Sequence, residues 1–472
     1  MQVLRRLRTI TAGAVSTLAI AVAAPAPALQ TAVTAHPTPA ISGHVFADLL
    51  TPPTTATCEA RFHIACYQPF QMQKAYDLVP LFASGIDGRG RTIVIVDSFG
   101  SPTIQDDLRT FDQVFGLPDP PSFQVIQPAG AVPPFPQDPF GVADRLGWAG
   151  ETTLDVEWAH VIAPAANIVL VETPTSETEG VQGFPEIVRA ENFVIDHGIG
   201  DVISQSFGAT EETFPNADSI TDLRGAFFNA RAHRVTVLAS SGDQGATDLL
   251  ADTSCCFPFR VNSWPSADPL VTSMGGTQLH LDANGNRTSP DLVWNDRFGA
   301  GGGGVSAVFR RPGFQHDVRG VVGDMRGTPD ISMSAAVDGA VITFSSYPNP
   351  NGPNPTAPNP RFHLVGGTSE ASPLFAGIVA LADQMAGRRL GFLNQRLYEM
   401  GADHAPGIVD VTSGNNSFTF CDANCGTPQE HDTTVVGFTA GPSFDLASGW
   451  GTVDAARFVP ELARRGGDDG TG

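Results

Sequence analysis

Basic residues are scarce in this sequence. Its 472 residues include 27 Lys and Arg against 49 Asp and Glu, so the formal net charge is -22. Nucleic acids are bound mainly by Lys- and Arg-rich surfaces, and the deficit therefore argues against such a partner. Carboxylates lose their charge at low pH, so the composition also suits a protein that must stay soluble in acid.

Long apolar segments are also nearly absent. An apolar run at residues 10–24 follows three arginines, and Ala26-Pro27-Ala28 has the small-x-small form of a signal-peptidase site. The run is short for a membrane-spanning helix, and no second long run follows it. We therefore predict a signal peptide at residues 1–28, a secreted, extracellular protein, and no membrane anchor.

Cysteine is limited to six residues, and an even number in an exported chain favours disulfides. They are Cys58, Cys66, Cys255, Cys256, Cys421 and Cys425. The spacing suggests that the first two and the last two close local loops, which leaves the adjacent middle pair for a vicinal bridge or for other partners. A metal site built from these cysteines would need two CxxC pairs, which the sequence lacks.

The chain shows no internal repeat, and its amino-acid composition changes along its length. We expect residues 29–57, rich in Pro, Thr and Ala, to form a linker or short leader, residues 58–465 to form one domain, and residues 466–472 to be a disordered tail. Short β-branched runs alternate with helix-length segments, which predicts an α/β fold with a parallel sheet covered on both faces. The expected strands are 92–97, 167–172, 201–204 and 234–239, the expected helices are 103–115, 150–162, 184–197 and 220–233, and the Pro-rich stretch 346–361 is expected to be an exposed loop before a last strand.

A serine at the start of a predicted helix is the first candidate for chemistry. Residues 366–373 read GGTSEASP and precede an apolar, periodic segment. Glycines permit a tight turn, and the N-terminal amides of the following helix would point at Ser369. Pro373 is expected in the first helical turn, where its missing amide costs nothing. The same residues are compatible with a simple helix cap formed by Thr368 or Ser369.

A nucleophilic serine needs a base, and the usual histidine segment is missing. Serine/histidine peptidases of the subtilisin type carry a His-Gly-Thr-His segment at the start of a helix, and this chain has none. Residues 150–160 read GETTLDVEWAH instead. Glu151 and Asp155 are four residues apart, so on a helix they share one face. Two close carboxyls resist double ionisation and can share a proton, which predicts that they replace the histidine.

Taken in order, these motifs resemble the sedolisins, or serine-carboxyl peptidases. The resemblance rests on the E-x-x-x-D helix followed by W-A-H-x-I-A-P, on SSGDQG at 240–245, and on the G-G-T-S-x-x-S-P turn, and it covers about 390 residues from Tyr67 to Phe458. It implies a subtilisin-like, three-layer α/β fold with a central, mostly parallel sheet flanked by helices. It also implies polypeptide substrates, and we expect a monomer.

The resemblance assigns a role to each matching residue. Ser369 is the nucleophile, Glu151 the general base and then acid, and Asp155 the carboxyl that orients Glu151. Asp243 lines the oxyanion hole and must be protonated to donate a hydrogen bond, which predicts activity on the acid side. Asp97, at the end of a strand, is expected behind the two helix carboxyls, although an Asp that simply starts a turn is the alternative.

A second set of residues near the C-terminus resembles the calcium site of the same family. The side chains of Asp410 and Asp445 and the carbonyls of Val411, Gly441 and Ser443 would enclose one calcium ion. All-oxygen ligation suits this hard cation. Ser443 stands where a glycine is usual, and the segment between the two halves is longer than expected. The alternative is a pair of unrelated surface turns.

Two other functions remain open from the sequence. A serine/histidine subtilase would use Asp97, His160 and Ser369, although a helix-end histidine packed at the sheet edge is the simpler interpretation of His160. An inactive relative that binds peptides is the second alternative, against which the complete set of catalytic positions argues.

Overall fold

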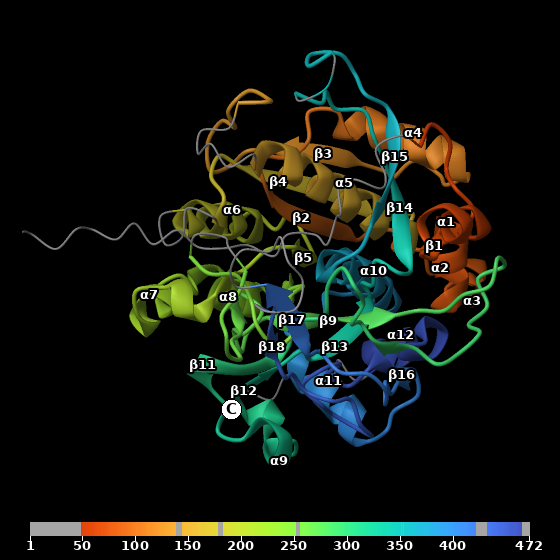
Figure 1. The fold of residues 1–472 in the computed structure, drawn as a ribbon. Coiled ribbons are helices and arrows are strands. Elements are labelled where there is room, and N and C mark those ends of the chain that lie inside the picture. The colour runs from red at the N-terminus through yellow and green to blue at the C-terminus, as the bar shows by residue number, and fades with distance from the viewer. Residues whose placement is uncertain are drawn as a thin grey trace, which may run out of the picture. The chain divides into compact units, whose positions relative to one another are not determined.

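A mostly parallel β-sheet forms the centre of the chain (Figure 1). The computed structural model describes residues 49–137, 144–177, 183–251, 255–350, 352, 354–421 and 432–464. The strands of this sheet are β2 (Thr92–Ser98), β3 (Phe123–Ile126), β4 (Asn167–Thr173), β5 (Val202–Gln205), β7 (Thr236–Ser240), β9 (Thr272–Gln278), β10 (Leu292–Val293) and β13 (Ile331–Ser334). They lie in the order β10-β9-β7-β5-β2-β4-β3, with β13 also paired to β9, and only the β10–β9 pair is antiparallel. The predicted parallel sheet is confirmed.

The remaining helices and strands of the described residues lie outside this central sheet. The helices are α1 (Thr55–Phe62), α2 (Pro69–Ala75), α3 (Val79–Ala83), α4 (Ile104–Phe115), α5 (Asp144–Ile162), α6 (Phe184–Asp196), α7 (Ala217–Thr221), α8 (Gly225–His233), α9 (Arg319–Val322), α10 (Thr368–Ala386), α11 (Asn394–Ala402) and α12 (Ala455–Arg464). The outlying strands are β1 (Cys66–Tyr67), β14 (Ala340–Ser345) and β15 (Arg361–Val365) in one sheet, and the pairs β6 (Ala209–Thr210) with β8 (Ser263–Trp264), β11 (Gly304–Arg310) with β12 (Met325–Thr328), β16 (Ile408–Val409) with β19 (Thr452–Val453), and β17 (Phe418–Cys421) with β18 (Asp432–Val435).

Alternating side chains of the central strands divide the interior into two cores. In β2, Ile93 and Ile95 point to one face of the sheet, where they pack with α5 and α10. Val94 and Val96 point to the other face and pack with α6 and α8. This alternation is the period-2 geometry of a strand, applied to a strand that is buried on both faces. The result is three layers, with the sheet between two sets of helices (Figure 1).

The predicted elements match the observed ones closely, with two differences in the helices. The predicted strands and the helix 103–115 agree with β2, β4, β5, β7 and α4 to within two residues. Helix α5 starts at Asp144, six residues earlier than predicted, since Trp148 and Ala149 are buried against the fold. The predicted helix 220–233 is instead two helices, α7 and α8, and Arg224 between them binds Asp268 through two hydrogen bonds of 2.6 and 2.9 Å. The Pro-rich stretch 346–361 connects β14 to β15, but β15 is not the last strand as predicted, because β16, β17, β18 and β19 follow it.

The two disulfides of the described residues agree with the sequence, whereas the predicted chain ends are not tested. Cys58 and Cys66 are bonded, as predicted, and Cys255 and Cys256 form the vicinal bridge. The third predicted bridge involves Cys425, which lies outside the described residues, as do the predicted signal peptide and tail. Helix α1 begins inside the segment predicted as a linker, so the boundary of the domain remains a prediction. Within the described ranges, no helix has both the length and the apolarity needed to cross a bilayer.

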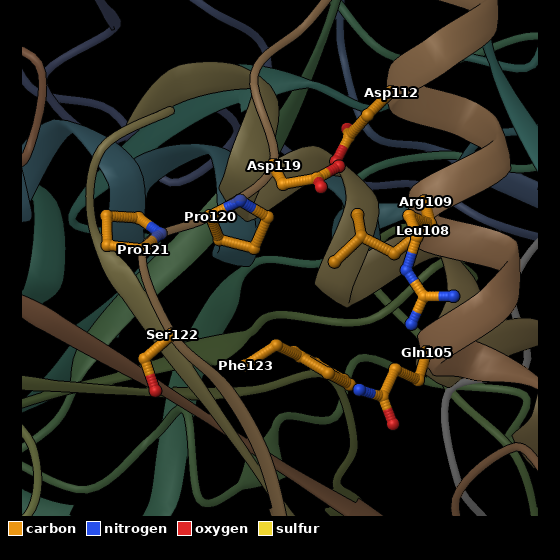
Figure 2. A pocket seen from close by; sticks show the side chains of 9 residues that line it. All are labelled: Gln105, Leu108, Arg109, Asp112, Asp119, Pro120, Pro121, Ser122 and Phe123. Atoms are coloured by element: carbon orange, nitrogen blue, oxygen red, sulfur yellow. The ribbon is translucent and has the colours of Figure 1, made fainter.

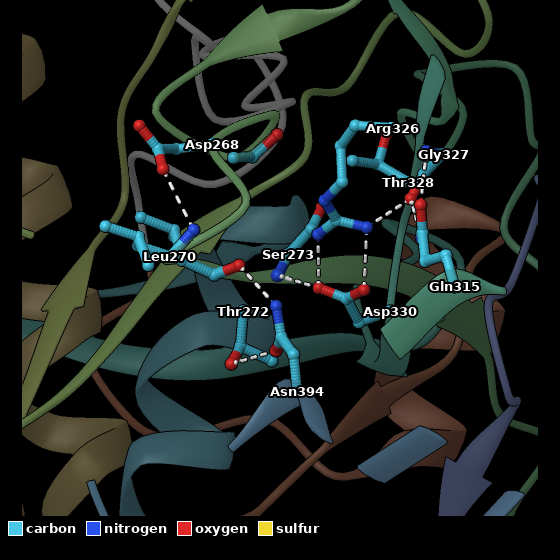
Figure 3. A network of polar contacts seen from close by, with 12 residues as sticks. Asp268, Leu270, Thr272, Ser273, Gln315, Arg326, Gly327, Thr328, Asp330 and Asn394 are labelled. Carbon is cyan, nitrogen blue, oxygen red and sulfur yellow. Dashed lines mark hydrogen bonds and ion pairs between the residues drawn. The ribbon is translucent and has the colours of Figure 1, made fainter. Parts of the chain in front are cut away.

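A fully buried ion pair ties the central sheet to the C-terminal part of the chain (Figure 3). Arg326, in β12, donates to both carboxylate oxygens of Asp330 at 2.8 and 2.6 Å. The same carboxylate accepts from the Tyr398 hydroxyl in α11 at 2.9 Å and from the Ser273 amide in β9 at 2.8 Å. A buried charge is tolerated only when it is paired and hydrogen-bonded, and this carboxylate has four donors.

Removing the cation of this pair should destabilise the protein strongly. Arg326→Met keeps a long side chain but leaves the Asp330 carboxylate buried without its partner, which typically costs about 3–5 kcal/mol. The loss is measured as a change in the free energy of unfolding in urea. The control is Arg89→Ala, which removes an exposed partner of Asp87 and should leave stability nearly unchanged. A loss of less than about 1 kcal/mol for Arg326→Met would contradict the structural role of the pair.

Candidate active site

Ser369 is the second residue of α10 and follows a turn that only glycine can make. A Cβ atom on Gly366 would lie 2.8 Å from the Ala335 carbonyl oxygen. Gly367 has a φ of 137°, a conformation that residues with a side chain rarely adopt. The turn therefore places Ser369 at the start of α10, as the sequence predicts.

Pro373 lies in the second turn of α10 and not in the first, contrary to expectation. A proline has no amide to donate to the carbonyl four residues before it, and here that carbonyl belongs to Ser369. Ser206, which follows β5, donates its hydroxyl to the Ser369 carbonyl at 3.2 Å. A side chain from the end of the sheet thus replaces the missing helical hydrogen bond and holds the start of α10 in place.

Helices α5 and α10 pack very closely, and this contact brings the helix carboxyls to the serine. A Cβ atom on Gly377, in α10, would lie only 2.5 Å from the Ile162 Cβ atom in α5. Glu151 and Asp155 are buried, with 3% and 0% of their surfaces exposed. The Ser369 hydroxyl is near enough to Glu151 to lower the pKa of that carboxyl, although neither group makes a hydrogen bond of standard geometry.

Three carboxyls form one electrostatic group at this point. Asp97 lies near the carboxyl end of β2 and is buried. Burial, and then the charge of Asp97, raises the pKa of both Glu151 and Asp155 well above the ordinary range. Burial also raises the pKa of Asp97 to about 7, although an interaction with the Thr152 hydroxyl opposes the rise. Because each ionisation makes the next one harder, the three groups hold protons in common.

Asp243 approaches the same place from the loop that follows β7. Its Oδ1 atom accepts from the Thr368 amide at 2.8 Å and from the Thr368 hydroxyl at 2.9 Å. Its Oδ2 atom is buried without a hydrogen-bond partner. Burial raises the pKa of Asp243 to about 7, so the carboxyl is neutral in acid and can donate a hydrogen bond. A neutral donor beside a serine has the chemistry of an oxyanion hole.

The five residues predicted to bind calcium also meet in one place. Asp410 Oδ2 accepts from the Ser443 amide at 2.7 Å, and Asp445 Oδ2 accepts from the Gly441 amide at 2.9 Å. The Val411 carbonyl is 3.4 Å from the Ser448 hydroxyl, which also contacts Asp445. No basic side chain is among the contacts found for the two carboxylates within the described ranges. The predicted ligands are all oxygen donors, whose chemistry suits calcium. Among the described residues, no group of three or more acidic, His or Cys side chains that could hold a metal ion is found.

Comparison with known proteins finds relatives of one family. The sequence matches no protein-family model. It is 30% identical over 404 residues to kumamolisin from Bacillus sp. (strain MN-32) and 27% identical over 413 residues to sedolisin from Pseudomonas sp. (strain 101), in each case over about 85% of this chain. A solved structure of Pseudomonas sedolisin, complexed with two molecules of pseudo-iodotyrostatin, matches with a TM-score of 0.66 and 25% identity, over 85% of this chain and 99% of that one. Over most of its length the chain is therefore similar to members of the sedolisin family.

The match to the solved structure of Pseudomonas sedolisin confirms the predicted subtilisin-like α/β fold. The chain spans 63% of the length of kumamolisin and 62% of the length of the full Pseudomonas sedolisin. The solved relative is a serine-carboxyl proteinase.

The placement of His160 argues against a histidine-dependent mechanism. His160 is nine residues after Glu151 on α5, which is about half a turn around the helix from it. Its Nε2 atom is 2.7 Å from the Pro118 carbonyl oxygen and 3.3 Å from Asp112 Oδ1. The ring therefore packs against α4, on the side of α5 that faces away from Glu151.

Two residues of the site, Ser206 and Glu177, are not predicted by the sequence motifs. Ser206 contacts both the Ser369 carbonyl and Asp155, whose pKa it lowers in part. Glu177 is buried, and its charge raises the pKa of Glu151. The one signal for these two residues in the sequence is that each follows a strand. Functional residues of a parallel sheet lie at the carboxyl ends of its strands.

A separate pocket lies between α4 and the segment that leads into β3 (Figure 2). In Figure 2 the carboxyls of Asp112 and Asp119 face one another at its edge. Its lining consists of Gln105, Leu108, Arg109, Asp112, Asp119, Pro120, Pro121, Ser122 and Phe123. None of the catalytic candidates is among them, so the pocket is not part of this site.

The buried carboxyls make stability depend on pH in a defined direction. The pKa is about 7 for Asp97, Glu211 and Asp243, and about 8 for Glu191 and Asp383, in each case chiefly because of burial. These folded-state values exceed the values of an unfolded chain, so the folded protein binds more protons between about pH 4 and 8. The free energy of unfolding should therefore be greatest near pH 4 and should fall as the pH rises to 8.

Urea unfolding at pH 4, 6 and 8, at constant ionic strength and calcium concentration, measures this dependence. Glu191→Gln is the matched variant, because Glu191 is buried and bonded to Gln205 and lies outside the catalytic group. It should flatten the slope by up to about 1.4 kcal/mol per pH unit over the upper part of the range. Stability that stays constant or rises from pH 4 to 8 would show that these groups ionise freely in the folded protein.

Proposed function

We propose that the protein is a secreted, acid-active serine-carboxyl peptidase that hydrolyses peptide bonds through an acyl-enzyme on Ser369. One observation carries the proposal: the buried carboxyls of Glu151, Asp155 and Asp97 lie beside the serine that starts α10. Such a group can accept and return one proton without a histidine. The relationship to kumamolisin and sedolisin supports it.

The first half of the reaction forms the acyl-enzyme. Ser369 Oγ adds to the carbonyl carbon of the peptide bond, and its proton passes to Glu151. The electron pair of the carbonyl double bond moves to the oxygen, and the proton on Asp243 Oδ2 donates a hydrogen bond to that oxyanion. Collapse of the intermediate breaks the C–N bond. Glu151 then returns its proton to the leaving amine, and the acyl group remains on Ser369.

The second half uses the same groups in reverse. Glu151 takes a proton from water while the water oxygen adds to the ester carbonyl, and the hydrogen bond from Asp243 supports the oxyanion again. Collapse breaks the bond to Ser369 Oγ, which recovers its proton, and the acid product leaves. Asp155 and Asp97 share protons with Glu151, so that these three carboxyls together carry one negative charge when the enzyme works.

The proposed enzyme acts on polypeptides outside the cell as a monomer. Export would follow from the signal sequence at residues 1–28, with cleavage after Ala28, and residues 58–465 would form the peptidase domain. The many buried carboxyls with a raised pKa support work in acid, because the folded protein is more stable when they are protonated.

Activity should decline as the pH rises through about 7, because Asp243 loses the proton that it donates. Ser369→Ala should abolish cleavage of a denatured protein substrate. Glu151→Gln should lower kcat by about 10²- to 10⁴-fold, and Asp243→Ala by about 10²- to 10³-fold. The measurement is kcat and kcat/KM for a quenched fluorescent peptide from pH 3 to 8.

His160→Gln is the control for the histidine-dependent alternative and should change kcat far less than Glu151→Gln. If Glu151→Gln retained wild-type acyl-enzyme formation in mild acid, the carboxylate mechanism would be wrong. If the purified wild-type protein cleaved no denatured protein between pH 3 and 8, the chain would be an inactive, peptide-binding relative.

We also propose that Asp410 and Asp445, with the carbonyls of Val411, Gly441 and Ser443, hold one calcium ion. The ion would neutralise two carboxylates on separate segments, Asp410 directly after β16 and Asp445, whose pKa is raised chiefly by burial. It would also join the strand end at 409–411 to the loop at 441–445, which strengthens the C-terminal part of the domain.

Removal of calcium should therefore lower the melting temperature. At a calcium concentration about 1,000 times the dissociation constant, bound ion contributes about 4 kcal/mol, so a chelator should lower Tm by several degrees. Asp410→Asn should lower Tm and abolish the effect of the chelator. Asp324→Asn, at an exposed carboxylate elsewhere, should leave that effect intact. An equal Tm with calcium and with chelator would rule out the site.

A further inference from the structure

The contacts of Asp243 are unequal at its two oxygen atoms, and this inequality has a chemical consequence. Oδ1 accepts two hydrogen bonds, both from Thr368, at 2.8 Å from the amide and 2.9 Å from the hydroxyl. Oδ2 is buried and has no hydrogen-bond partner. Only 1% of the Asp243 surface is exposed, so Oδ2 is shielded from bulk solvent.

A neutral carboxyl carries its proton on one oxygen only, and the surroundings decide which. The Thr368 amide can donate but cannot accept. A proton on Oδ1 would therefore point at another proton, whereas a proton on Oδ2 leaves both Thr368 contacts intact. The acid form of Asp243 must then carry its proton on Oδ2, the oxygen that is free to serve an oxyanion.

The Thr368 hydroxyl also anchors the backbone next to Asp243. It accepts from the Gly242 amide at 3.1 Å and lies 3.1 Å from the Gly242 carbonyl oxygen. Thr368 immediately precedes Ser369 in α10, so one residue links the loop after β7 to the nucleophile. The distance between the proton donor and the nucleophile therefore depends on this link.

We propose that Thr368 is a positioning residue that makes Oδ1 of Asp243 a permanent acceptor and thereby directs the Oδ2 proton to the oxyanion. The inference rests on the proposed peptidase function, which it deepens. It assigns a separate task to the threonine of the G-T-S turn, whose hydroxyl acts through Asp243 and not on the substrate.

The charged groups that influence the pKa of Asp243 are all acidic. Asp248 and Asp296 raise its pKa, and Asp243 in turn raises the pKa of Glu151. The two Thr368 contacts act in the opposite direction, because they stabilise the ionised form. Loss of the Thr368 hydroxyl should therefore raise the pKa of Asp243 while it loosens the carboxyl.

The test compares Thr368→Val with Thr368→Ser in peptide hydrolysis from pH 3 to 8. Thr368→Val removes one of the two hydrogen bonds that Oδ1 of Asp243 accepts. As a result, kcat should fall about 3- to 10-fold with little change in KM. The alkaline limb of the pH profile should move to higher pH. Thr368→Ser retains the hydroxyl and should behave like the wild type. Thr368→Ala, which removes the hydroxyl without adding a methyl group, is the second variant and should reproduce the shift if Thr368→Val does not fold.

A double variant separates positioning from general structural damage. In the Asp243→Ala background, Thr368→Val should cause no further loss of kcat, because the group on which it acts is gone. An equal loss in both backgrounds, or an unmoved alkaline limb in the variants that lack the hydroxyl, would overturn the inference. If the wild type itself has no activity, the proposed function fails, and ¹³C NMR titration of Asp243 then decides the inference alone: the pKa must rise in Thr368→Val, and an unchanged pKa refutes it.

Discussion

The close packing of α5 against α10 is the contact on which the site depends. Gly377 leaves no room for a side chain, because a Cβ atom there would lie 2.5 Å from the Ile162 Cβ atom. That approach sets Glu151 and Asp155 on α5 beside the serine at the start of α10. A side chain at this position would therefore force the two helices apart. The same packing buries both carboxyls, and burial supplies most of their raised pKa.

Burial of acidic groups links the chemistry to stability. Water is excluded from the carboxyls beside Ser369, so their ionised forms are costly, and the same is true of Glu191, Glu211 and Asp383 elsewhere in the domain. In acid these groups are neutral and are compatible with the interior. The protein therefore pairs a mechanism that needs protonated carboxyls with an interior that favours low pH.

Two further structures hold the framework around the site. The buried Arg326–Asp330 pair ties β9, β12 and α11 together, and its four donors leave the Asp330 carboxylate fully bonded. Thr368 links the loop after β7 to the start of α10 through Asp243. Of the residues that make these contacts, Thr368 and Asp243 belong to motifs named from the sequence, where Thr368 is also compatible with a simple helix cap.

Much of the fold and of the candidate site could be derived from the sequence because the decisive signals are local. The turn at 366–367 needs glycine for its backbone, a four-residue spacing puts Glu151 and Asp155 on one helix face, and β-branched runs form the strands. Tertiary structure alone decided that Ser206 replaces the hydrogen bond lost at Pro373, that His160 faces Asp112, and which oxygen of Asp243 is free. Those features depend on residues that are far apart in the chain and meet only when the sheet and helices pack, so no local pattern can encode them.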